Sequence, residues 1–393
     1  MTVREVRGHI RELDGLRGIA ILLVIVHHYW PETGPWSTWK RLPHLGWIGV
    51  DLFFVISGLL IAGILLDTKN ASGFFSSFYA RRALRIFPLY YVVLLASFIL
   101  IPLLQGGTWA GSEFVRQSGS PVWYLFYQGN LREAIVGHEP AYVLAPLWSL
   151  AIEEQFYLLF PLLVFTTPRR LLRRLLVGML IFAPLFRIAT ALIWPANERI
   201  QYLATPSRVD VLAVGCLLAL GLREGWLKIP DRVLQRALLA GLAIVAVVFA
   251  ANGFDRTSMF GRTAGYTLIG GFLATLVLWA VTHRESASTA WLRWAPLRGL
   301  GKICYGVYLL QRPMQVVVGK VLEHFRIAVD STSLWYMAML MGVTFATAAT
   351  SWFAFEKPLL KLKRRFSVSG HPEAAADGHS SSASPKVTVV TSR

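Results

Sequence analysis

The sequence predicts an all-α protein, a polytopic membrane helix bundle of about ten transmembrane helices. Of its 393 residues, 55% are hydrophobic and 16% are charged, and the mean hydropathy is +0.51. This composition is too apolar for a soluble domain of this size. Apolar stretches of about 20 residues recur, which is the length that a helix needs to cross the hydrocarbon core. Ten-residue segments of alternating polarity, typical of a membrane β-barrel, are absent from the sequence.

The apolar runs divide the chain into ten spans joined by polar connections. The first span follows three arginines and leads into His27-His28 without a small-residue cleavage site, so we expect a retained helix rather than a signal peptide. The expected spans are 14–31, 47–66, 86–105, 145–166, 175–194, 208–223, 237–252, 264–282, 303–322 and 334–355.

The formal net charge of +17 is distributed over the connections between spans. An even number of spans places both termini on one side, and the segments on that side hold 25 of the 39 Lys and Arg residues. This asymmetry predicts cytoplasmic termini in the plasma or inner membrane. Because the charge forms no single patch and no nucleic-acid module is recognisable, we expect the lipid bilayer as a partner and no nucleic acid.

Two segments outside the spans have distinct compositions. The longest outer loop, about 106–144, is rich in aromatic residues, which could stack on a sugar ring or on a hydrophobic polyketide or form an interfacial belt. The tail from 367 is rich in Ser, Ala, Gly and His without apolar periodicity. We therefore expect one membrane domain over 1–366 and a disordered cytoplasmic tail over 367–393.

The first span carries Arg17 and His28, eleven residues or about three helical turns apart. Both therefore share one helix face, separated by about 16 Å. His28 could accept a proton from a hydroxyl because the pKa of imidazole lies near neutral pH, and Arg17 could hold phosphate oxygens. Spacing alone also allows an ordinary basic flank and an interfacial histidine. His27 is a rival base that points about 100° away from His28.

Two further clusters of charge fall on spans three and four. Arg82 and Arg85, three residues apart, share a helix face and suit the phosphates of coenzyme A, although arginines there would also orient the helix. Glu153 and Glu154 lie within an apolar run, where a lone carboxylate is costly. Either glutamate could orient an imidazole or anchor Arg82, and a purely structural ion pair is the alternative.

Further polar residues lie in other spans. Asp51 interrupts span two, and Arg208 and Asp210 open span six, where we expect the two charges to neutralise each other across the helix start. All three suit pairing as well as catalysis. The sequence contains neither a phosphate-binding Gly-rich loop with Lys-Ser/Thr nor a His-Glu-x-x-His motif, so we expect no metal.

The ordered set of motifs resembles the acyltransferase-3 family of integral-membrane acyltransferases over about 11–360. It comprises Leu13-Asp14-Gly15-Leu16-Arg17-Gly18 with His28, Gly49-Val50-Asp51-Leu52-Phe53-Phe54-Val55-Ile56-Ser57-Gly58, Arg82-Ala83-Leu84-Arg85, Trp148-Ser149-Leu150-Ala151-Ile152-Glu153-Glu154-Gln155-Phe156-Tyr157, Arg208-Val209-Asp210 and Phe355-Glu356-Lys357-Pro358. One departure is visible: Gln311 stands where family members often have His, so span nine is expected to offer hydrogen bonding rather than a second base.

The resemblance implies O-acylation with acyl-CoA, acetyl-CoA in the first instance, as donor on the cytoplasmic side. The acceptor would be a hydroxyl of a carbohydrate or of a glycosylated or polyketide compound, such as envelope polysaccharide or a macrolide-type antibiotic in a biosynthetic pathway. His28 would be the general base or a transient acyl carrier, and Glu153 or Glu154 would orient it or complete a charge pair. Arg17, Arg82 and Arg85 would bind the donor phosphates or stabilise developing negative charge.

A transporter is the alternative class, because proton-coupled carriers also use buried Arg, His and Glu. Carriers often show Gly- or Pro-broken spans in matching halves, and no such pairing is evident in the sequence. Acyl transfer by the purified protein would separate the two classes. The identity of the acceptor, the acyl chain length and the choice between direct transfer and an acyl-enzyme are left open by the sequence.

Overall fold

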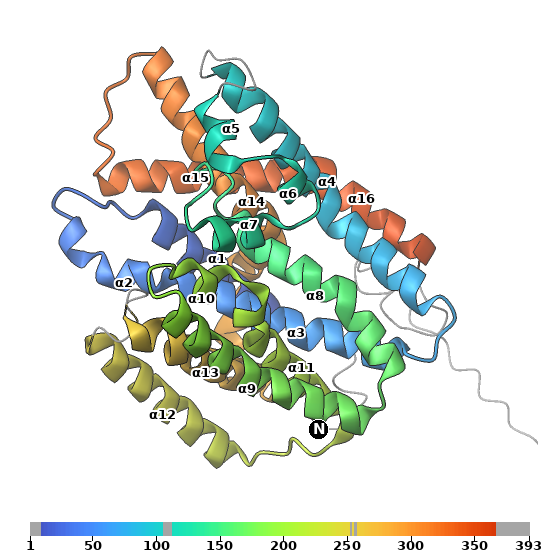
Figure 1. The fold of residues 1–393 in the computed structure, drawn as a ribbon. Helices are drawn as coiled ribbons and strands as arrows, with labels where there is room; N and C mark the ends of the chain where they lie inside the picture. Colours follow the sequence, from blue (N-terminus) through green and yellow to red (C-terminus); the bar gives the residue numbers. More distant parts are fainter. Residues whose placement is uncertain (1–8, 105–111, 252–253, 255–257, 367–393) are drawn as a thin grey trace, which may run out of the picture.

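The long apolar runs of the sequence fold as helices (Figure 1). The computed structural model describes residues 9–104, 112–251, 254 and 258–366, and within these residues all regular secondary structure is helical. The predicted all-α fold is therefore confirmed. The tail 367–393, expected to be disordered, lies outside the described residues. The long helices are α1 (Arg11–Tyr29), α3 (Ile48–Thr68), α4 (Phe74–Leu104), α8 (Leu147–Thr166), α9 (Arg169–Ile193), α11 (Val209–Glu224), α12 (Asp231–Ala250), α13 (Tyr266–Thr282), α14 (Ala295–His324) and α15 (Leu334–Ser351).

Each of the ten expected spans coincides with one of these long helices. The largest differences are that α4 begins at Phe74 rather than at 86 and α14 at Ala295 rather than at 303. In both cases the helix extends through a basic segment, because hydropathy marks the lipid-soluble part of a helix and not its hydrogen-bonded length. Among the described residues, seven helical segments are individually long and apolar enough to cross a membrane, and they contain α3, α4, α8, α9, α12, α13 and α15.

The remaining long helices, α1, α11 and α14, carry or adjoin several of the charges that the sequence places inside the membrane. Figure 1 shows α1 and α14 in the interior of the bundle, between α3 and α15. Burial inside protein makes such charges tolerable, because they face other helices rather than lipid.

Close packing between α1 and α14 brings their backbones together. A Cβ added to Gly18 would collide with the main-chain oxygen of Leu297, and one added to Gly301 with that of Asp14. Small residues allow helices to approach closely in membranes, where packing replaces the hydrophobic effect as the driving force. This approach fixes the register of α1 against α14 and so determines which side chain of α14 meets His28.

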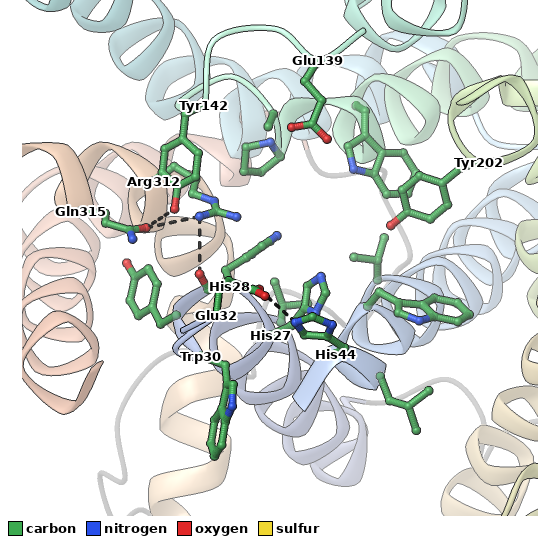
Figure 2. Close-up of a pocket in the computed structure, with 18 of the residues that line it drawn as sticks. His27, His28, Trp30, Glu32, His44, Glu139, Tyr142, Tyr202, Arg312 and Gln315 are labelled. Atoms are coloured by element: carbon green, nitrogen blue, oxygen red, sulfur yellow. Dashed lines mark hydrogen bonds and ion pairs between the residues drawn. The ribbon is translucent and has the colours of Figure 1, made fainter. Parts of the chain in front are cut away.

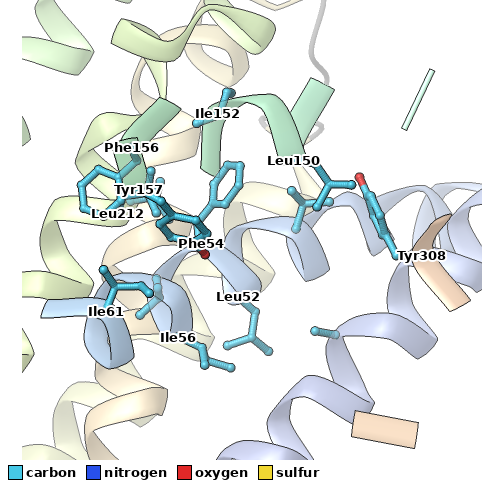
Figure 3. Close-up of a cluster of buried hydrophobic side chains, with 14 of the residues drawn as sticks. Leu52, Phe54, Ile56, Ile61, Leu150, Ile152, Phe156, Tyr157, Leu212 and Tyr308 are labelled. Carbon is cyan, nitrogen blue, oxygen red and sulfur yellow. The ribbon is translucent and has the colours of Figure 1, made fainter. Parts of the chain in front are cut away.

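A buried apolar cluster joins α3, α8 and α11 beside this pair (Figure 3). Phe54 of α3 contacts the ring of Trp148 edge-on, with ring centroids 6.2 Å apart, and Leu212 of α11 is fully buried in the same cluster. Around this core lie the short helices α2 (Arg41–His44), α5 (Glu113–Ser118), α6 (Val122–Leu125), α7 (Gly129–Val136), α10 (Arg199–Leu203) and α16 (Lys357–Leu360).

The direction of α1 defines two ends of the bundle. We call the end at which α1 begins the Arg17 end, and the end at which it finishes the His28 end. Helices α2, α7 and α10 contribute side chains to one cavity at the His28 end. The starts of α4 and α9, rich in arginine, lie at the Arg17 end, where α3 and α8 finish.

Candidate active site

His28 is held by a residue of α14. Its Nδ1 lies 2.9 Å from Oε1 of Gln311, and Nε2 of Gln311 donates to the main-chain oxygen of Tyr308 at 3.1 Å. The second bond fixes which end of the amide faces His28. Because Oε1 can only accept, Nδ1 of a neutral His28 carries the proton, and Nε2 has the lone pair that a general base needs. The hydrogen bonding expected of Gln311 is therefore confirmed.

The next residue of α1 anchors this arrangement. The hydroxyl of Tyr29 donates to the main-chain oxygen of Gln311 at 2.6 Å and lies 2.8 Å from Oγ1 of Thr344. Tyr29, Gln311 and Thr344 are all buried. The end of α1 is thereby joined to both α14 and α15, so the position of His28 does not depend on the outer loops.

His28 lines a cavity of about 930 Å³ at the His28 end (Figure 2). We call it the His28 cavity. Much of its wall is aromatic, and the rings come from Trp30, Trp47, Tyr142, Trp148, Tyr202, Tyr266, Tyr308 and Tyr336. The volume is at the upper end of the range for ligand sites. Between these rings the wall carries acidic and basic side chains, so it offers both stacking surfaces and hydrogen-bonding groups to one organic molecule.

His27 also lines the cavity, next to a second histidine. Its ring centroid lies 5.1 Å from that of His28 and 5.7 Å from that of His44, and Nε2 of His44 lies 2.9 Å from Oε1 of Glu32. Both candidate bases therefore reach the same space. For His28, the contact of Nδ1 with Gln311 fixes the orientation of the ring.

Arg312 is a cavity residue that the sequence did not reveal. Its Nη1 lies 3.4 Å from the main-chain oxygen of His28 and 3.3 Å from Oε1 of Gln315. Its guanidinium stacks on the ring of Tyr142 at 3.9 Å, and the hydroxyl of Tyr142 donates to Gln315. Arg312 lies near the middle of the expected span 303–322, so a charge inside an apolar run is the sequence signal that could have revealed it. The aromatic loop on which it stacks is distant in sequence and gave no signal.

The aromatic loop residues divide into two groups. Tyr142 reaches the cavity, whereas Tyr124 and Tyr127 are buried against α4, where Tyr90 donates to the main-chain oxygen of Tyr124. Trp109 lies outside the described residues. Contact between a loop ring and an acceptor therefore stays a prediction for Tyr142 and is wrong for Tyr124 and Tyr127, which pack as core.

The other predicted residues gather toward the Arg17 end and form what we call the Arg17 cluster: Arg17, Arg82, Arg85, Glu153 and Glu154. The charges of Arg82 and Arg17 act on the carboxylate of Glu153, and Arg85 acts on Arg17. Arg82 lies over the ring of Tyr157 at 5.5 Å. None of the five lines the His28 cavity. The half-buried cluster brings three cations from α1 and α4 to two carboxylates from α8.

The two glutamates have different surroundings. The hydroxyl of Ser57 donates to Oε1 of Glu153 at 2.6 Å. Oε1 of Glu154 is buried without a hydrogen-bond partner among the described residues, and Arg82 is the cation that acts on it. Because Gln311 occupies Nδ1 of His28, the orienting role expected of Glu153 or Glu154 falls to Gln311 instead. The alternative, partnership with Arg82, agrees with the structure.

The polar residues of spans two and six pair differently from expectation. Arg208 forms an ion pair with Asp51, both fully buried, and its guanidinium lies 4.4 Å from the centroid of Tyr266. Asp210 pairs with Arg187 at 2.9 Å. Neutralisation of Arg208 by Asp210 is therefore wrong, because each charge finds its partner on another helix. Arg187, on α9, was missed because hydropathy alone does not reveal its partner.

The His28 cavity is also lined by a buried carboxyl, Glu133, which the sequence analysis did not single out. Glu133 of α7 lies 3.5 Å from Arg199, whose other terminal nitrogen binds Glu139 at 2.5 Å. Burial raises the pKa of Glu133 to about 8, because desolvation outweighs the attraction of Arg199. Its Oε1 has no hydrogen-bond partner among the described residues. A carboxyl that is neutral at pH 7 can donate a hydrogen bond.

The helical bundle, with charged residues buried between spans and a base beside a cavity, defines a multi-pass membrane protein with the layout of an enzyme. The sequence profile of the acyltransferase domain family matches residues 10–353. The chain therefore belongs to the acyltransferase-3 family, as its motifs indicated.

Named relatives are similar over most of this chain. It is 29% identical to peptidoglycan O-acetyltransferase OatA of Listeria monocytogenes, over 92% of this chain and 57% of the relative. It is 30% identical to the putative peptidoglycan O-acetyltransferase YrhL of Bacillus subtilis, over 89% and 55%, and 30% identical to O-acetyltransferase OatA of Staphylococcus aureus, over 78% and 50%. The chain thus spans about half the length of these curated relatives. No solved structure matches it.

Proposed function

We propose that this protein is a membrane-embedded O-acyltransferase that moves an acetyl group from acetyl-CoA to a hydroxyl of a carbohydrate. The observation that carries the proposal is the position of His28 in a large aromatic cavity, with its tautomer set by Gln311. The family of the chain and the O-acetyltransferase names of its relatives support the reaction type.

The donor is proposed to enter from the Arg17 end. Coenzyme A is polyanionic and cytosolic, and the Arg17 cluster offers three cations with guanidinium forks that suit phosphate oxygens. The basic segments of the chain adjoin this end, as cytoplasmic connections do under the positive-inside rule. Cytoplasmic termini in the plasma or inner membrane follow from the same proposal. Arg17 and His28 are separated by about 16 Å along α1, so an elongated donor would bridge the two regions.

The transfer step uses His28 as a general base. The acceptor oxygen attacks the thioester carbonyl carbon while its proton passes to Nε2 of His28, and the carbonyl π electrons move to oxygen. When the carbonyl re-forms, the C–S bond breaks and the departing thiolate takes the proton from His28. The products are an O-acetyl ester and free coenzyme A, and no net proton is released.

The acceptor is proposed to be a sugar hydroxyl at the outer face, because the His28 cavity lies at the end opposite the basic segments. The relatives named for peptidoglycan make cell-wall glycan the first acceptor to test. Other envelope polysaccharides and macrolide-type antibiotics are further compounds for the same assay. The aromatic rings of the cavity suit the apolar faces of a sugar, and its charged side chains suit the hydroxyls.

The test is acetyl transfer by the full chain in lipid nanodiscs, with radiolabelled acetyl-CoA and soluble peptidoglycan fragments, followed by mass spectrometry of the products. His28→Gln should lower kcat by about 10²–10⁴ because general-base catalysis is lost. The matched variant His27→Gln keeps the Gln311 contact and should lose much less. Uptake of the fragments by vesicles without any need for acetyl-CoA would instead indicate a transporter, and equal losses in both variants would contradict the assignment of the base.

A further inference from the structure

The proposed transfer step places negative charge on the thioester oxygen beside His28, and this inference rests on that step. Electrostatic stabilisation of such an oxyanion is usually a large part of catalysis. The arginines expected to provide it belong to the Arg17 cluster, which contributes no side chain to the His28 cavity. A different positive group must therefore serve the reacting carbonyl.

Three arginines line the His28 cavity, and their surroundings differ. Arg199 is paired with the carboxylate of Glu139 at 2.5 Å and also lies 3.5 Å from the buried carboxyl of Glu133. Arg41 is exposed and donates to the main-chain oxygen of Phe249 at 2.9 Å. Arg312 forms no ion pair with any carboxylate in the described ranges, although it is partly buried. Among the three, Arg312 is the partly buried arginine without a directly paired carboxylate in the described ranges, and Glu139 acts on it only through space.

The placement of Arg312 is rigid and close to the base. It follows Gln311 on α14, contacts the main-chain oxygen of His28 at 3.4 Å and is stacked on Tyr142 at 3.9 Å. Figure 2 shows Arg312 and His28 facing the same space, with Gln315 behind the guanidinium. Its Nε is buried without a hydrogen-bond partner among the described residues.

Holding such a cation without a counter-charge costs stability, because a buried charge loses solvation that only a partner can replace. Because of this cost, an arginine that a protein keeps inside the membrane is a functional candidate. Stacking on Tyr142 and the two hydrogen bonds from Nη1 leave the charge in place and do not neutralise it. A preorganised cation of this kind needs no reorganisation when negative charge develops.

We propose that Arg312 is a catalytic residue that stabilises the oxyanion formed when the acceptor attacks the thioester carbonyl. The electron pair of the broken C=O π bond rests on oxygen beside the guanidinium while His28 holds the acceptor proton. On collapse the pair returns to re-form C=O, the C–S bond breaks and the thiolate leaves with that proton. Arg312 exchanges neither electrons nor protons and acts by charge alone.

The experiment compares Arg312→Gln, Arg312→Lys and the control Lys320→Gln, which removes an exposed charge from the same helix. Acetyl transfer to peptidoglycan fragments and hydrolysis of acetyl-CoA by water are measured in nanodiscs, together with acetyl-CoA affinity as evidence of correct folding. Arg312→Gln should lower kcat of both reactions by about 10²–10³ with unchanged acetyl-CoA affinity. Arg312→Lys, which keeps the charge, should retain a larger part of the rate.

Two results would overturn this role while leaving the proposed function intact. If Arg312→Gln raises only the KM for the fragments and leaves hydrolysis unchanged, Arg312 binds the acceptor and not the oxyanion. If both reactions proceed at the wild-type rate in Arg312→Gln, the residue has no catalytic role. Failure of the wild-type protein itself to transfer or hydrolyse the acetyl group would reject the proposed function, and with it this step.

Discussion

The Arg17 cluster and the His28 cavity differ in composition although one helix joins them. The cluster consists of arginines and carboxylates that act on one another within the bundle. The cavity is walled by aromatic rings and holds its base through a neutral amide. The arginines of the cluster suit the phosphates of a polyanionic donor, and its carboxylates balance their charge when no donor is bound. The aromatic rings of the cavity suit an organic acceptor. Donor binding and proton transfer are thus assigned to different ends of α1.

The largest effect on donor affinity is expected from Arg82→Gln, which tests the Arg17 cluster. If the Arg17 cluster binds donor phosphates, loss of this guanidinium removes charge-assisted hydrogen bonds, each about twice as strong as a neutral one. We expect acetyl-CoA affinity to fall by about tenfold to 100-fold, in line with about 1.5–3 kcal/mol for hydrogen bonds to charged groups. Isothermal titration of the protein in nanodiscs with acetyl-CoA measures the change.

Arg170→Gln is the matched control, because this exposed arginine opens α9 near the same end of the bundle. It removes the same charge from the same end but not from the cluster, so affinity should stay close to wild type. Equal losses in Arg82→Gln and Arg170→Gln would mean that general surface charge attracts the donor. The division between the two regions would then lose its support.

Gln311→Leu tests the other region and should have a smaller effect. The substitution removes the acceptor for Nδ1 of His28 but leaves the imidazole in place. A net hydrogen bond contributes about 0.5–1.5 kcal/mol, so we expect kcat to fall by up to about tenfold. The KM for acetyl-CoA should not change, because the Arg17 cluster is intact. Steady-state kinetics with varied acetyl-CoA separate the two parameters.

Gln311→His supplies the rescue variant, since an imidazole can also accept from Nδ1 and is the residue expected from the family resemblance. Recovery of kcat in this variant would show that hydrogen bonding, rather than the shape of the side chain, is required. A fall in kcat in Gln311→His equal to that in Gln311→Leu would contradict the role of Gln311 in setting the tautomer of His28.

The helices and most of the individual site residues were predictable from sequence for one physical reason. Backbone groups in lipid must be bonded within the segment, so a long apolar run can only be a helix there. An ionisable residue in such a run costs free energy, so its presence indicates a functional or pairing role. Arg17, His28, Glu153 and Glu154 were recognised on this basis, and the apolar runs around them gave the helix positions.

Pairings between helices were not predictable, because they depend on how the helices pack. Arg208 and Asp210 are neighbours in sequence, yet they bind Asp51 and Arg187 on other helices. The stacking of Arg312 on Tyr142 was not predictable for the same reason, since Tyr142 lies on a loop far away in the chain. Likewise, the sequence predicts that Glu153 or Glu154 orients His28, whereas in the structure Gln311 contacts that ring. Residue type identified these groups, whereas only the packing of the helices identified their partners.

For Glu133 an effect on stability rather than on activity is expected, and its pH dependence distinguishes the cavity from the Arg17 cluster. The pKa of this carboxyl is raised from 4.5 to about 8, chiefly by burial. Between these pH values the unfolded chain loses the proton while the folded protein keeps it, so the contribution of Glu133 to stability is lost as pH rises toward 8. Glu133→Gln cannot ionise, and its melting temperature relative to wild type should therefore increase between pH 5 and pH 8.

Thermal unfolding in nanodiscs over this pH range measures the difference, and Glu139→Gln on the same loop reports the loss of an exposed carboxylate. A difference between Glu133→Gln and wild type that is constant with pH would contradict the raised pKa. The expected result would identify a neutral carboxyl on the cavity wall at pH 7, able to donate a hydrogen bond to an acceptor oxygen. The Arg17 cluster, whose residues are unchanged in this variant, should bind acetyl-CoA with wild-type affinity at each pH.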